Sequence, residues 1–185
     1  YKALYAATAG GTNNVAIGDS ALYEVSAGGN IAVGGWGAGR YITSGMYNIG
    51  IGQQALYGNS TSKLTGSYNT GIGYQSGLNL TTGQYNVLNG YQAGYGLTAG
   101  SYNLCLGWQA GDSITSANYN ICLGGKAGAG VVAGANNVLV GHESAKTYNF
   151  SNVTAVGFQA GELNQGSDNV FVGYKAGRSE TASNK

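Results

Sequence analysis

A short motif recurs ten times along the chain and constrains the fold more than any other feature. It consists of an Asn, an aliphatic residue, a variable residue, a second aliphatic residue and a Gly, often followed by an Ala-Gly pair. A spacing of 16 to 21 residues separates the motif Gly residues, and most steps are 16 or 17. Such a period matches one coil of a solenoid. The motif Gly residues are Gly18, Gly34, Gly52, Gly73, Gly90, Gly107, Gly124, Gly141, Gly157 and Gly173.

The repeat predicts an all-β fold, a parallel β-solenoid of about ten coils with 16–17 residues each, and a single repeat domain over residues 1–185. In residues 102–111, apolar residues alternate as in a short strand, and Ala110-Gly111 then supplies a tight corner. Coils of this kind stack about 4.8 Å apart through backbone hydrogen bonds. The longest step between motif Gly residues contains an insertion, residues 57–63, which we expect to protrude as a loop.

Both faces of the expected strands are apolar. The residues three and one before the motif Gly are nearly always Val, Ile or Leu, as in Val15 and Ile17, so we expect these positions to face the core. The residue between them points the opposite way, yet it is also apolar or Gly. Strands with two apolar faces usually lie between packed layers. We therefore expect a second chain to cover the outer face in a homo-oligomer, with a threefold bundle favoured. The alternative is that these residues pack on loops of the same chain.

Composition excludes several classes of function. Only 8% of residues are charged, the net charge is +1, and the eight Lys and Arg residues are scattered, so we expect no nucleic-acid partner. No stretch of about 20 apolar residues is present, so we expect no membrane insertion. The segment Tyr1-Lys2-Ala3 repeats the pattern of Tyr174-Lys175-Ala176. This phase predicts incomplete terminal coils, either because the chain is a fragment or because subunits join head to tail.

The segment from Asn14 to Ala21, with its echoes along the chain, resembles the head repeats of trimeric autotransporter adhesins (YadA-like). It is also similar to repeats of phage tail fibres and bacterial surface fibres. The resemblance implies a left-handed parallel β-roll, three chains side by side, and work in adhesion or host contact. The repeat unit here is longer than that of the adhesin heads.

The chain offers no motif for catalysis, a cofactor or a metal, so we expect a protein that is not an enzyme and binds none of these groups. His142 is the single histidine, and we expect it in a surface row of ring side chains. Cys105 and Cys122 share one phase of the repeat, which predicts neighbouring buried thiols. A disulfide between them is the alternative, although adjacent parallel strands would strain it.

Three rows, one polar and two aromatic, recur at fixed phases of the repeat. One is an Asn row, which we expect to form amide ladders along the stack: Asn14, Asn30, Asn48, Asn69, Asn86, Asn103, Asn120, Asn137 and Asn169. A Tyr residue precedes the Asn in five consecutive units, from Tyr47 to Tyr119, and a second aromatic row follows the motif Gly. The aromatic rows either contact surface glycans or stack between coils.

Four Asn-x-Ser/Thr acceptors for N-glycosylation occur, at Asn59, Asn79, Asn149 and Asn152. Asn59 is the best candidate because it lies in the insertion. We expect an extracellular or cell- or virion-surface protein that forms a structural fibre or fibril for adhesion or matrix formation. The alternatives are a receptor-binding segment of a phage tail fibre and a carbohydrate-binding β-helix.

Overall fold

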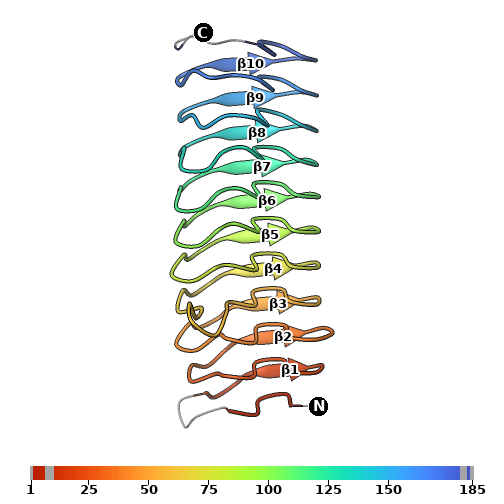
Figure 1. The fold of residues 1–185 in the computed structure, drawn as a ribbon, viewed down its shortest axis with the longest axis vertical. Coiled ribbons are helices and arrows are strands. Elements are labelled where there is room, and N and C mark those ends of the chain that lie inside the picture. Colours follow the sequence, from red (N-terminus) through yellow and green to blue (C-terminus); the bar gives the residue numbers. More distant parts are fainter. Residues whose placement is uncertain (1, 7–10, 180–182, 184–185) are drawn as a thin grey trace.

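Ten short parallel strands, stacked in chain order, build the part of the chain that the structure describes. The computed structural model describes residues 2–6, 11–179 and 183. All ten strands belong to one sheet with the order β1 to β10, and Figure 1 shows them one above another along the long axis. This arrangement confirms the parallel β-solenoid. The strands are β1 (Val15–Ile17), β2 (Ile31–Val33), β3 (Ile49–Ile51), β4 (Thr70–Ile72), β5 (Val87–Asn89), β6 (Leu104–Leu106), β7 (Ile121–Leu123), β8 (Val138–Val140), β9 (Thr154–Val156) and β10 (Val170–Val172).

Each strand pairs with the next without any shift in register. Val87 of β5 lies opposite Leu104 of β6, and Leu104 lies opposite Ile121 of β7. Equal positions of the repeat therefore form columns along the axis, and each column has one chemical character. The ends of the expected domain, residue 1 and residues 184–185, lie outside the described residues.

The expected assignment of the strand faces was wrong. The middle residue of each strand points inward: Leu88, Cys105 and Leu139 are fully buried. Val15 and Ile17, expected in the core, are 44% and 59% exposed. The physical reason is the alternation of a strand, which places the Asn before the strand and the middle residue on one face. The buried Asn thus fixes the inward face, whereas the apolar pattern cannot, because both faces are apolar.

Three inward positions of each coil make up the core in the coils of β5, β6 and β7. In the coil of β6 these are Cys105, Ala110 of the Ala-Gly corner and Ile114, all fully buried. Equivalent aliphatic residues at the third position are Leu80, Leu97 and Val131. In the coil of β9 this position holds a buried Asn164, and its neighbour Leu163, the apolar residue of that segment, is only partly buried.

The motif Gly residues permit the close stacking of the corners. Gly90 has a φ of 139°, a conformation that side chains rarely adopt. A Cβ atom there would also lie 2.7 Å from the carbonyl carbon of Gly107 in the next coil. The position therefore requires Gly for two independent reasons.

The insertion lies between β3 and β4. Residues 60–63 are exposed, and the coil resumes where Leu64 forms an isolated bridge with Ile42. These residues add a surface loop without breaking the sheet, because β3 and β4 still pair directly.

Candidate interaction surface

From Asn14 to Asn137, the Asn row forms a continuous hydrogen-bonded ladder inside the stack. In the central coils, Asn103 donates its backbone N–H and its Nδ2 to Asn86 Oδ1, at 2.9 and 3.1 Å. Asn103 Nδ2 also donates to the carbonyl of Ala117 at 2.8 Å. The same pattern links the members from Asn30 to Asn137, and Asn14 Oδ1 accepts from the backbone of Asn30. Because these amides are buried and bonded within the stack, their role is structural.

The ladder changes in the coil of β9, where Val153 takes the place of Asn. The Val153 N–H still donates to Asn137 Oδ1 at 2.9 Å. In the next coil, Asn169 Nδ2 donates to Asn164 Oδ1 at 3.0 Å. The buried Asn164 thus continues an amide network where the regular ladder stops.

A second amide ladder lies on the surface. Gln75 Nε2 donates to Gln54 Oε1 at 2.9 Å, and Gln92 and Gln109 continue the row at 2.9 and 3.0 Å. In the sequence, these Gln residues recur two residues after the motif Gly.

The outward side chains of the strands form an apolar surface, which we call the sheet face. It comprises the first and third residues of all ten strands, and seventeen of these twenty positions are Val, Ile or Leu. The three others are Thr70, Asn89 and Thr154, so no charged residue interrupts the face. A continuous apolar patch of this length is unusual on an isolated protein, so the sheet face is the candidate interaction surface.

A row of five stacked tyrosines lies immediately before the strands. Successive rings from Tyr47 to Tyr119 lie 4.9 to 5.2 Å apart, with interplanar angles of 3 to 19°. Each Tyr has a φ between 56 and 60°, the left-handed region, which is unfavourable for a large side chain. The equivalent positions of other coils hold Asn, Asp or Gly, which tolerate this conformation. The stacking of the rings offsets this backbone cost.

The second aromatic row follows the motif Gly residues and includes His142. The His142 ring stacks on Phe158 at 5.8 Å, and Phe158 stacks on Tyr174 at 5.5 Å. Tyr74 and Tyr91 stack at 5.5 Å further along the same phase. His142 therefore lies in a ring row, as the sequence predicts.

The two cysteines lie side by side in the core. Cys105 of β6 pairs in register with Cys122 of β7, and both are buried free thiols. The pKa of the Cys122 thiol lies well above its usual range. The largest cause is a hydrogen bond with Cys105, and the second is burial of the thiol. The protonated form is inert as a nucleophile and as a metal ligand.

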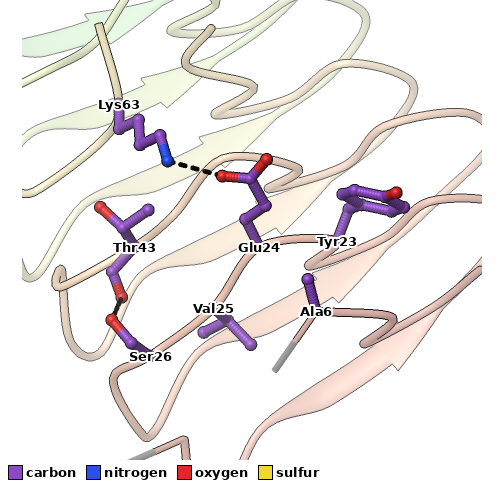
Figure 2. Close-up of a pocket in the computed structure, with 7 residues that line it drawn as sticks. All are labelled: Ala6, Tyr23, Glu24, Val25, Ser26, Thr43 and Lys63. Carbon is purple, nitrogen blue, oxygen red and sulfur yellow. Dashed lines mark hydrogen bonds and ion pairs between the residues drawn. The ribbon is translucent and has the colours of Figure 1, made fainter. Parts of the chain in front are cut away.

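The described residues form three ion pairs, and in one of them the carboxylate of Glu162 is buried. Figure 2 shows an open pocket beside the first two strands, where Lys63 of the insertion lies 2.7 Å from Glu24. In the same pocket, Ser26 Oγ donates to the carbonyl of Thr43 at 2.9 Å. Within the described ranges, no three His, Cys, Asp or Glu side chains gather as a metal site would require. The Lys63 contact ties the insertion to an earlier coil.

Glu143 predicts a small dependence of stability on pH. Hydrogen bonds from Lys146 Nζ at 2.7 Å and Gln159 Nε2 at 2.8 Å lower the Glu143 pKa from 4.5 to about 2. Because the pKa is lower in the folded protein, this stabilisation is present above pH 4.5 and is lost as the pH falls towards 2. We expect Glu143→Gln to cost up to about 1 kcal/mol at pH 7.

The measurement is urea unfolding of both proteins between pH 7 and pH 2. Their difference should vanish at the acid end. Burial also raises the pKa of Asp112. Because Asp112 is present in both proteins, its contribution to the pH dependence cancels in the difference between them. A difference that is independent of pH would contradict the assignment to the ionised carboxylate.

Comparisons with known protein families, curated proteins and solved structures return no match to this chain. Across the described ranges, no helix has the length and apolar character needed to cross a membrane.

Proposed function

We propose that this chain is an extracellular structural β-solenoid that assembles into a fibre or fibril and serves adhesion or matrix formation. The observation that carries the proposal is the uncharged aliphatic sheet face, which runs over all ten strands. A surface of this kind favours association, because apolar area removed from water stabilises a complex by about 25 cal/mol per Å². The interior amide ladder and the buried unreactive thiols support a structural role over an enzymatic one.

The sheet face covers part of the area that a stable interface needs. Ten strands at about 4.8 Å spacing, each three residues of about 3.3 Å long, give it roughly 480 Å². Stable complexes bury about 800 Å² on each partner. We therefore expect the interface to extend from the sheet face over the neighbouring Tyr row, since interfaces are enriched in Tyr.

A second copy of this chain is the partner that matches this surface. The columns of the sheet face repeat at the spacing of the coils, so only a surface with the same repeat fits along its whole length. Two uncharged faces also meet without electrostatic repulsion. We propose lateral association through this face, with a homotrimer as the favoured form and head-to-tail polymerisation as the route to longer fibres.

Charges placed on the sheet face should prevent lateral association. Leu106 and Leu123 are the outward third residues of the adjacent strands β6 and β7. In the double variant Leu106→Lys and Leu123→Lys, burying two ammonium groups in the interface costs several kcal/mol. Light scattering after size exclusion should show a multiple of 18.7 kDa for the parent and 18.7 kDa for the variant.

Ser116→Lys adds a charge at an exposed position outside the strands and is the matched control, with the parent mass expected. Circular dichroism should show that all three proteins keep their strands. A parent that stays at 18.7 kDa at high micromolar concentration would refute lateral association. Electron microscopy of the parent tests the fibre itself: filaments much longer than about 48 Å, the length of ten coils, support it, and discrete rods contradict it.

The exposed ring rows favour a second candidate, binding of surface glycans. Tyr, Trp and Phe side chains offer large contact areas to sugars. In the Tyr row, however, each inner ring is covered on both sides by its neighbours at about 5 Å, leaving edges and hydroxyls exposed. A glycan array would test this candidate, and we rank it second for that reason.

A further inference from the structure

We infer that Asn59 is the N-glycosylation site of this chain, and that the other three acceptor sequences stay unmodified in the folded protein. The inference rests on the proposed extracellular location, since the modification takes place on exported chains. All four acceptor sequences match the Asn-x-Ser/Thr pattern equally well. They differ in how each is packed in the fold.

The middle residue of each acceptor sequence separates Asn59 from the others. In three of them the middle residue belongs to the core: Leu80 and Val153 are fully buried, and Phe150 is 3% exposed. A modifying enzyme must hold all three residues in its own site, so engaging these would pull a core side chain out of the stack. Ser60, in the middle of the Asn59 sequence, is exposed. The loop can therefore enter an enzyme without disturbing the coils.

The local turn at Asn59 presents its amide. Asn59 Oδ1 accepts hydrogen bonds from Thr61 Oγ1 at 2.8 Å and from the backbone N–H of Thr61 and Ser62 at 3.0 and 2.6 Å. All these bonds use the oxygen. A glycan replaces one hydrogen of Nδ2, so the turn persists after modification.

Two of the other acceptors use their amide Nδ2 to bond a neighbouring coil. Asn79 Nδ2 donates to the carbonyl of Tyr95 at 2.9 Å, and Asn152 Nδ2 donates to Asp168 Oδ1 at 2.8 Å. Asn149, like Asn59, uses its Oδ1 as an acceptor, here for the backbone N–H of Ala133 and Gly134, so the buried Phe150 is the feature that separates it from Asn59. A sugar on Asn79 or Asn152 would replace a contact that joins two coils.

The donor is a lipid-linked oligosaccharide pyrophosphate. Asn59 Nδ2 attacks the anomeric carbon of its first sugar, the bond from this carbon to the pyrophosphate oxygen breaks, and the lipid pyrophosphate leaves. An Nδ2 proton passes to a base of the transferase. No oxidant or reductant is needed.

The test is secretion of the full chain from yeast with an added signal sequence and a flexible terminal acceptor tag. Molecules with an occupied tag are collected from the folded, soluble fraction. Enzymatic release of the glycans in heavy-oxygen water marks each occupied Asn, and peptide mass spectrometry locates it. We expect Asn59 to be marked in most molecules, and Asn79, Asn149 and Asn152 to be unmarked.

Matched variants complete the test. Asn59→Gln and Thr61→Ala should abolish the modification, whereas Thr61→Ser keeps the acceptor hydroxyl and should retain it. An unmarked Asn59 beside an occupied tag overturns the inference, as does a marked Asn79, Asn149 or Asn152 in folded protein. Because the signal sequence is supplied, such a failure leaves the fibre proposal standing. A monomeric parent would refute that proposal without affecting the glycan result.

Discussion

The Gly90→Ala variant is expected to lose at least about 3 kcal/mol of stability, because it combines backbone strain with a collision inside the stack. Gly90 has a φ of 139°, and an added Cβ would collide with the carbonyl group of Gly107. The methyl group meets backbone atoms, which cannot rotate away as a side chain can. Relief requires separating β5 from β6, the middle of the sheet. Urea unfolding followed by circular dichroism measures the loss.

Gly35→Ala is the matched control. The nearest atom to a Cβ at Gly35 is Gln53 Cβ at 3.6 Å, an ordinary contact, and Gly35 has no positive φ. We expect a change within about 0.5 kcal/mol, as for most surface substitutions. If Gly90→Ala and Gly35→Ala lowered the free energy of unfolding equally, the close approach of the backbones would not explain why the motif positions require Gly.

The second large effect is expected for Asn103→Leu, at about 3–5 kcal/mol. This substitution removes the acceptor that Asn120 uses for its backbone N–H at 3.0 Å and its Nδ2 at 3.1 Å. It also removes the Nδ2 donor to the Ala117 carbonyl. Each buried polar group left without a partner costs about 1–3 kcal/mol, and Leu offers no replacement. Chemical denaturation gives the free energy of unfolding.

Asn89→Leu tests whether the loss belongs to the ladder. Asn89 is an outward residue of β5 on the sheet face, so its replacement should change stability by less than about 0.5 kcal/mol. The chain itself places Val153 at one ladder position, where Asn164 supplies an additional buried amide. A small effect of Asn103→Leu would mean that the stack tolerates breaks without such compensation.

The motif spacing predicted the solenoid and the shared phases of its columns, and the structure has them. When coils of nearly equal length stack in parallel, residues at one phase of the repeat become neighbours, so the spacing alone predicts which side chains meet. The pairing of Cys105 with Cys122 follows directly. The placement of His142 among ring side chains follows in the same way.

The sequence could not decide between residues whose local patterns are equal. Four acceptor sequences look alike, and only the fold shows that Ser60 is exposed while Leu80 is buried. The burial of Asn164 in the coil of β9 could not be predicted from the sequence either, because its neighbour Leu163 is the apolar residue of that segment. A residue's direction depends on where the corner turns the backbone, and corner geometry depends on the neighbouring coils.

The period of the chain, and with it the solenoid and its columns, can be predicted from the sequence, because stacking coils of equal length turns a repeat in sequence into a repeat in space. The choice of the strand face that points inward depends on the folded chain. A shift of one residue exchanges the two faces of a strand. Because these three-residue strands are apolar on both faces, their hydrophobic pattern does not specify which face is buried. The buried Asn ladder and the packing of Leu88 and its equivalents against the corners fix the direction, and Val15, Ile17 and their equivalents are left to form the outer surface.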